Sequence, residues 1–128
     1  EYRPLHILIV EDTEDNRLLV GAFLKKMPYS LDYAENGQVG LEMFKTQGPY
    51  DMVLMDMQMP VMDGYTAVRE IRAWEEKEKK TRTAIIALTA YAMIGDVQRS
   101  LDSGCDSHLS KPIKKMELIQ AISQFPRV

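Results

Sequence analysis

Hydrophobic positions in this chain follow two alternating patterns. Short apolar runs, bounded by turn-forming or charged residues, predict buried β-strands at Leu5–Val10, Leu31–Ala34, Met52–Met55, Ala84–Leu88 and His108–Ser110. Leu31–Ala34 is more polar than the first, third and fourth runs, so we expect this strand near an edge of the sheet. The last run is the weakest of the five candidates.

Between these runs, apolar residues recur with the spacing of an amphipathic helix. Val20, Phe23, Leu24 and Met27 occupy positions i, i+3, i+4 and i+7, which predicts a helix that is stopped by Pro28. Four more helices are predicted from similar spacings, which are formed by Val39, Met43 and Phe44, by Ala67, Ile71 and Trp74, by Ile94, Val97 and Leu101, and by Leu118, Ala121, Ile122 and Phe125.

Strands that alternate with helices predict a parallel sheet with right-handed crossovers and helices on both faces. We therefore predict an α/β protein with the flavodoxin-like (βα)5 three-layer sandwich, whose parallel five-stranded sheet has the strand order 2-1-3-4-5. In such sheets, ligands bind beyond the carboxyl ends of the strands, where the winding reverses between the first and third strands. Candidate functional residues should therefore follow the apolar runs directly.

The length and charge of the chain restrict the class of protein. Its 128 residues suffice for one domain, which we expect to span residues 1–128 with a core at about 5–125. The 16 basic and 19 acidic residues are mixed along the chain, a balance that does not indicate direct nucleic-acid binding.

Three further observations concern the cellular context. No apolar run approaches the length of a membrane span, about 18 residues, so we expect no membrane contact by this domain. Because Cys105 is the single cysteine, an internal disulfide is excluded, and a reducing cytoplasm is the expected compartment. The chain begins with Glu1 rather than Met, which suggests that it was cut from a longer protein.

Charged and hydroxyl residues follow four of the predicted strands. Glu11 and Asp12 follow the first, Asp56 the third, Thr89 the fourth and Lys111 the fifth. In the predicted strand order these residues converge on one crevice, where the three carboxylates repel one another. Mg²⁺ relieves such repulsion, because it prefers carboxylate, water and phosphate oxygens as ligands. With an ammonium and a hydroxyl group beside it, the site suits a phosphoryl group, and an aspartate can act as its nucleophile.

Four segments, in this order and spacing, are specific to one family. They read ILIVEDTEDN from Ile7, VLMDMQMPVMDG from Val53, IALTA from Ile86 and DSHLSKP from Asp106. On these segments the chain resembles, over essentially its whole length, the receiver domain of response regulators in two-component signalling. The segments MDMQMPVMDGYTAVREIR and ALTAYAM look most like receivers of hybrid sensor histidine kinases.

This resemblance implies roles for the acidic residues. Asp56 would be the phosphate acceptor, and Glu11 and Asp12 would help it to hold Mg²⁺, together with the backbone carbonyl of Gln58. Mn²⁺ is expected to substitute for Mg²⁺, and no organic cofactor is implied. Gln58 and Tyr91 are also expected to influence the lifetime of the phosphate by controlling the access of water.

The resemblance also implies a switch. Thr89 and Lys111 would each contact a phosphoryl oxygen, and the peptide bond between Lys111 and Pro112 would be cis. Many receivers carry Tyr or Phe three positions before the lysine, where this chain has His108. An imidazole is smaller and more polar than these rings and changes charge near neutral pH, so we expect His108 to couple differently to the threonine.

Partners and an output follow from the same resemblance. A phosphohistidine on a histidine kinase or a histidine phosphotransfer domain would donate the phosphoryl group, without catalytic turnover by this domain. Phosphorylation would shift the face formed by the fourth helix, the fifth strand and the fifth helix, and a phosphorylation-dependent dimer is one output. The parent protein would be cytoplasmic, or its receiver would be the cytoplasmic part of a membrane-bound hybrid kinase.

Two other functions need similar residues. A Mg²⁺-dependent phosphatase with an aspartyl-phosphate intermediate would use the same carboxylate, hydroxyl and lysine. Phosphatases that resemble the haloacid dehalogenase family usually carry a second aspartate two positions after the nucleophile, where this chain has Gln58, which cannot transfer a proton. An interaction module that is never phosphorylated is disfavoured because every residue of the acceptor site is present.

The remaining charged segment has an ordinary structural interpretation. Glu75 and Glu76 lie four positions before Lys79 and Lys80, which predicts a solvated helix end with i,i+4 ion pairs.

Single residues near the site are also assigned structural roles. Most of the nine methionines are expected to fill the core, although Met57 and Met59 flank the proposed nucleophile and are candidates for gating access to it. Thr13 is the expected N-cap of the first helix, and Cys105 is expected to pack near the start of the fifth strand.

Overall fold

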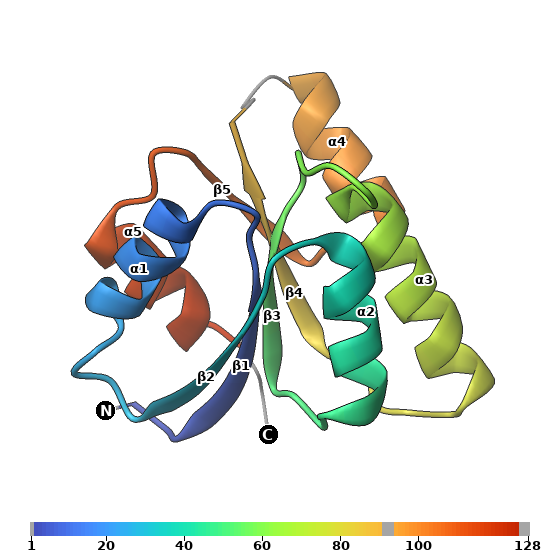
Figure 1. Ribbon diagram of the computed structural model, residues 1–128, viewed down its shortest axis with the longest axis horizontal. Coiled ribbons are helices and arrows are strands. Elements are labelled where there is room, and N and C mark those ends of the chain that lie inside the picture. Colours follow the sequence, from blue (N-terminus) through green and yellow to red (C-terminus); the bar gives the residue numbers. More distant parts are fainter. Residues whose placement is uncertain (1, 91–93, 126–128) are drawn as a thin grey trace.

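The computed structural model describes residues 2–90 and 94–125, which contain one parallel sheet of five strands. The strands are β1 (Leu5–Val10), β2 (Tyr29–Ala34), β3 (Met52–Asp56), β4 (Ala84–Thr89) and β5 (Ser107–Ser110). Their order is β2-β1-β3-β4-β5, which confirms the predicted topology and places the polar strand β2 at an edge (Figure 1).

In the described residues, five helices cover the two faces of the sheet. They are α1 (Glu14–Phe23), α2 (Gly37–Thr46), α3 (Gly64–Lys77), α4 (Ile94–Ser103) and α5 (Lys115–Ser123). α1 and α5 pack on one face, whereas α2, α3 and α4 lie on the other (Figure 1). The protein is therefore the three-layer sandwich that its sequence predicts. Within the described ranges, no helix combines the length and apolar character needed to cross a bilayer.

The central strands are apolar because both of their faces are covered. β3 and β4 are buried at every position, and β1 is buried at every position but one. Successive side chains of a strand point to opposite faces, so Leu8 and Val10 join the hydrophobic cluster beneath α2 and α3, whereas Ile7 and Ile9 join the cluster beneath α1 and α5. These two clusters hold the strand ends in fixed positions.

The first helix ends earlier than its apolar spacing predicts. α1 ends at Phe23 rather than next to Pro28, and the chain turns where the Met27 N–H donates to the Leu24 carbonyl at 3.0 Å. Leu24 is nevertheless 1% exposed, and Met27 packs against the same hydrophobic cluster. The apolar spacing therefore reports burial that continues after the helix has ended.

The charged end of α3 differs from the prediction. Glu75 is buried rather than solvated, and it accepts hydrogen bonds from Arg72 at 2.8 Å and from the Thr83 backbone N–H at 2.8 Å. Arg72 also donates to Asp106 at 2.9 Å, so this cluster connects α3 to the starts of β4 and β5. The predicted partner of Glu75, Lys79, lies beyond the helix, where a positive φ of 57° turns the chain away.

Predictions for three residues near the strand ends have different outcomes. Met57 is 1% exposed in the core cluster, so the hypothesis that it gates access is wrong, whereas Met59 is partly buried against the same cluster. Cys105 is buried just before β5, as predicted. Tyr91 lies outside the described residues.

Candidate functional site

Asp56 is the last residue of β3 and lies at the centre of the candidate site. Its side chain is fully buried, although an aspartate carboxylate is costly to remove from water. The Oδ1 atom accepts hydrogen bonds from Lys111 Nζ at 3.2 Å and from the Gln58 backbone N–H at 3.1 Å. The Oδ2 atom is buried and has no hydrogen-bond partner among the described residues, which leaves it available to a ligand.

The acidic pair after β1 lies beside this carboxylate because β1 and β3 are neighbouring strands. One carboxylate oxygen from each of Glu11, Asp12 and Asp56 lies within 4.8 Å of the others. Glu11 is 1% exposed, and its Oε2 atom accepts hydrogen bonds from the Thr13 N–H and hydroxyl, each at 3.2 Å. Thr13 occupies the N-cap position of α1 as predicted, but its hydroxyl orients Glu11 instead of capping the helix.

Lys111 compensates for the charge of two of these acids. Its Nζ atom lies 3.2 Å from Glu11 Oε1 and 3.2 Å from Asp56 Oδ1. Burial by itself lowers the pKa of Lys111, but the charges of Asp56 and Glu11 raise the pKa above its usual value. The lysine therefore stays protonated between the two carboxylates.

The pKa values of the two buried acids, Asp56 and Glu11, are shifted in opposite directions. Burial, reinforced by the charge of Glu11, raises the pKa of Asp56 to about 7, even though the Gln58 N–H and Lys111 act in the opposite direction. Burial also raises the pKa of Glu11, but the Thr13 N–H and Lys111 outweigh it and leave that pKa below its usual value. The single ammonium group of Lys111 therefore does not neutralise all the carboxylates at this site.

Thr89 and the side chain of Gln58 close the other side of the site. Thr89 ends β4 and is fully buried. The side-chain amide of Gln58 donates to Thr89 Oγ1 at 3.4 Å, and it accepts from the Ala90 backbone N–H at 3.2 Å. The sequence does not predict this bridge. The neutral amide also occupies the place where a phosphatase of the type considered above would carry its second aspartate.

The predicted switch residues on β5 are also located. His108 lies on this edge strand, three positions before Lys111, and it is partly exposed. The Lys111 N–H donates to the Thr89 carbonyl at 2.7 Å, so a hydrogen bond links the ends of β4 and β5. The peptide bond between Lys111 and Pro112 is cis, as the family resemblance implies.

The donor set fits a hard divalent cation. It consists of one carboxylate oxygen from each of Glu11, Asp12 and Asp56, and within the described residues Asp56 also has one buried oxygen, Oδ2, without a hydrogen-bond partner. Mg²⁺ is usually held by one or two carboxylates together with waters and phosphate oxygens, and this cluster supplies the carboxylates.

Two further residues support this cluster. Asn16 donates to Glu11 Oε2 at 3.4 Å, and Arg17 donates to the Glu11 carbonyl at 2.7 Å. Asn16 is part of a segment that carries the family resemblance, whereas nothing in the local sequence distinguishes Arg17 from an exposed arginine.

Comparison with known proteins identifies the family of this chain. Residues 7–123 match the response regulator receiver domain. The chain belongs to this family. It is thus a receiver domain of a two-component phosphorelay, as its four sequence segments predict.

Several curated relatives of this receiver are much longer than the chain. "Probable histidine kinase 2" of rice (Oryza sativa subsp. indica) is 38% identical over 138 aligned residues, which include 95% of this chain and 13% of the relative. The chain therefore spans about an eighth of the length of this relative. Sensor and hybrid histidine kinases are among the similar curated proteins, in agreement with the predicted subfamily, and a two-component response regulator of rice is another.

Solved structures confirm the fold. The receiver domain of Saccharomyces cerevisiae Ssk1, crystallised with the histidine phosphotransfer protein Ypd1, matches with a TM-score of 0.92 and 32% identity over 97% of this chain and 90% of that chain. The receiver of a Pseudomonas aeruginosa sensor histidine kinase, which has a magnesium ion coordinated in its active-site cleft, matches with a TM-score of 0.84 and 37% identity over 95% of this chain and 97% of that chain.

Proposed function

We propose that Asp56 accepts a phosphoryl group from a phosphohistidine of a histidine kinase or a histidine phosphotransfer protein. The observation that carries this proposal is the fully buried Asp56 carboxylate, which lies next to two further acids and a lysine. Its Oδ2 atom has no hydrogen-bond partner among the described residues. The Ssk1 receiver, a similar structure, was crystallised with a histidine phosphotransfer protein, which supports a donor of this class.

In this reaction an Asp56 oxygen attacks the phosphorus atom of the phosphohistidine. The new P–O bond forms as the P–N bond breaks, and the electron pair of the broken bond stays on the imidazole. Lys111, which already contacts Asp56, would neutralise a phosphoryl oxygen, and the Thr89 hydroxyl would donate a hydrogen bond to another. Such transfers need positioning and charge compensation more than covalent chemistry by the protein.

A divalent cation would be held by Glu11, Asp12 and Asp56, with the Gln58 carbonyl as a further ligand. When bound, Mg²⁺ supplies positive charge that offsets the acids and the transferring phosphoryl group. Mn²⁺ takes oxygen ligands as well and would substitute for it. The carboxylate cluster and its unpartnered oxygen support this proposal.

The output would follow from movement at the ends of β4 and β5. Contact of Thr89 and Lys111 with the phosphoryl group would shift the population of the face formed by α4, β5 and α5, where His108 lies. This face would engage an output partner or a second phosphorylated copy. Because sensor and hybrid histidine kinases are among its relatives, we propose that the chain belongs to the cytoplasmic part of a hybrid histidine kinase.

Chemical phosphorylation tests the acceptor directly. The 128-residue chain, incubated with Mg²⁺ and acetyl phosphate, is expected to gain one phosphoryl group, which intact-mass spectrometry detects. Asp56→Asn should gain none, because the amide is not a nucleophile for phosphorus. Asp102→Asn makes the same change at an exposed position of α4 and should be labelled like the unsubstituted chain. Equal labelling of Asp56→Asn, or an unchanged mass of the unsubstituted chain, would contradict the proposal.

A further inference from the structure

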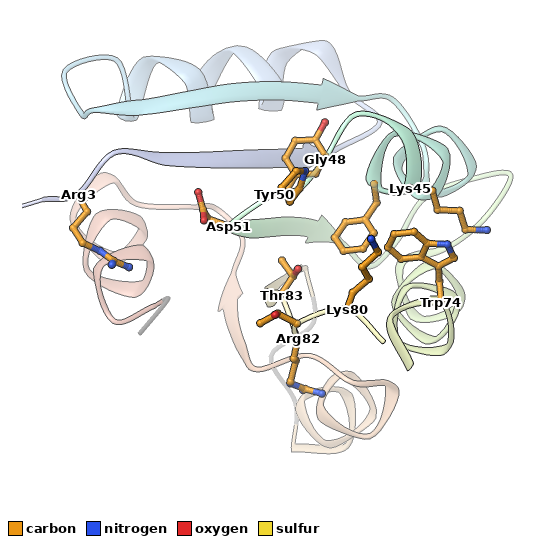
Figure 2. A pocket seen from close by; sticks show the side chains of 12 residues that line it. Arg3, Lys45, Gly48, Tyr50, Asp51, Trp74, Lys80, Arg82 and Thr83 are labelled. Atoms are coloured by element: carbon orange, nitrogen blue, oxygen red, sulfur yellow. The ribbon is translucent and has the colours of Figure 1, made fainter. Parts of the chain in front are cut away.

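A hollow lies at the opposite end of the sheet from Asp56. It has a volume of about 580 Å³, and its lining residues include Asp51 and Thr83, which immediately precede β3 and β4 (Figure 2). Asp56, in contrast, ends β3. The volume lies within the range of about 300–1,000 Å³ that is typical of small-molecule sites.

Aromatic rings form one wall of this hollow. Phe44 from α2 and Trp74 from α3 meet edge to face, with ring centres 5.7 Å apart. Tyr50 stacks on Phe44 with a centre distance of 6.3 Å. Trp74 is only partly buried, so part of this aromatic side chain faces the solvent.

The charge of the hollow is opposite to that of the whole chain. Four basic residues line it, namely Arg3, Lys45, Lys80 and Arg82, whereas Asp51 is the one acid that lines it among the described residues. The chain as a whole has a formal net charge of −3. A local excess of cations beside exposed aromatic surface favours an anion that carries a ring.

Among the described residues, Lys45 and Lys80 have no carboxylate partner. Arg82, in contrast, is bound to Asp106 at 2.9 Å. The Lys80 Nζ atom lies 5.8 Å from the centre of the Trp74 ring. Lys80 and Trp74 are neighbours in Figure 2, so an acidic group that binds Lys80 would lie beside the Trp74 ring.

We propose that this hollow between α2, α3 and the starts of β3 and β4 binds a small planar aromatic anion, held by Lys45 and Lys80 and stacked on Trp74. The site is separate from the acidic cluster, because the two lie at opposite ends of the same strands. Binding here is therefore independent of the phosphorylation proposed above.

Naphthalene-2-sulfonate is a suitable probe, because Trp74 is the single tryptophan of the chain and gives one indole N–H resonance in NMR spectra. Titration should shift this resonance saturably. Naphthalene-2-methanol, which has the same ring without the charge, should bind at least tenfold more weakly. Asp56→Asn should bind the sulfonate with unchanged affinity.

Charge-reversal variants locate the binding. Lys45→Glu combined with Lys80→Glu should weaken binding of the sulfonate at least tenfold, whereas the matched pair Lys25→Glu and Lys26→Glu, exposed just after α1, should not. Thermal melting verifies that both double variants are folded. The proposal is wrong if the indole resonance does not shift saturably, if the neutral ring binds equally well, or if both double variants retain full affinity.

Discussion

Gln58 connects the proposed acceptor with the proposed switch. Its backbone N–H donates to Asp56, while its side-chain amide donates to Thr89 and accepts from the Ala90 N–H. The side chain therefore joins the loops that follow β3 and β4. Because a phosphoryl group on Asp56 would compete for Thr89, the amide of Gln58 stabilises the unphosphorylated arrangement.

Removal of this amide should ease phosphorylation. Gln58→Ala keeps the backbone N–H and carbonyl but loses two side-chain hydrogen bonds, each with a net free energy of about 1 kcal/mol. We expect the initial rate of labelling by acetyl phosphate to rise about fivefold. The bond to Thr89 is the one that competes with the phosphoryl group, and a loss of about 1 kcal/mol corresponds to about a fivefold change in rate. Gln98→Ala, which removes an exposed amide on α4, is the matched control and should leave the rate unchanged. A rate at or below that of the unsubstituted chain would refute the role of Gln58.

At the level of elements, the junction between β3 and α3 requires a residue without a side chain. A Cβ atom on Gly64, the first residue of α3, would collide with the Asp56 carbonyl and lie 2.6 Å from Met57 Cα. Both are backbone atoms, which cannot rotate away. α3 is therefore able to start directly beneath the acceptor only because position 64 is glycine.

Two Gly→Ala substitutions separate this close contact from the general effect of glycine in helices. Gly64→Ala should lower the free energy of unfolding by about 2 kcal/mol or more, because the overlap must be relieved by backbone movement. Gly95→Ala, in the first turn of α4, should raise it by about 0.5 kcal/mol, because among the described residues no atom beyond its own helix turn lies within 4 Å of the added Cβ, and the unfolded chain loses freedom. Urea denaturation measures both, and similar changes in the two variants would contradict this explanation.

On the scale of the whole molecule, charge is divided between the two ends of the sheet. The carboxyl ends gather Glu11, Asp12 and Asp56, whereas basic residues surround the hollow at the amino ends. The acidic end is only partly compensated by Lys111. Burial of Asp56 without a bound metal ion therefore opposes folding at any pH where this carboxylate is charged in the unfolded chain.

The resulting pH dependence has a definite sign. In the folded protein the pKa of Asp56 is raised from 3.8 to about 7, so between these values the folded state retains a proton that the unfolded chain has released. The free energy of unfolding should therefore fall as the pH rises through this window, by on the order of 4 kcal/mol, because each pKa unit corresponds to about 1.4 kcal/mol. Urea titrations in EDTA measure it.

Two variants and added metal test the assignment to Asp56. Asp56→Asn should remove this decline and be more stable than the unsubstituted chain at pH 8 (a value just above the window), whereas Glu70→Gln, at an exposed position of α3, should retain it. Added Mg²⁺ should stabilise the unsubstituted chain at this pH, because it binds the folded state. A decline of equal size in Asp56→Asn would show that another group is responsible.

Much of the fold and of the candidate site could be predicted from the sequence. Apolar runs and helical spacings locate all five strands and helices, because periodic burial is a local property of the chain. The strand order then places Glu11, Asp12, Asp56, Thr89 and Lys111 at one edge, and the structure brings all of them together there.

What the tertiary structure alone decided is which partner each polar group finds. Glu75 was predicted to pair with Lys79 but is bound to Arg72 and the Thr83 N–H, and the amide of Gln58 crosses to the loop after β4. Burial and ion pairing depend on residues far apart in the chain, which local spacing does not encode. The motifs and the periodicity of this sequence thus determine its fold, its family and the residues at its acidic edge, whereas the charge balance around Asp56 and the basic aromatic hollow arise only when distant elements pack together.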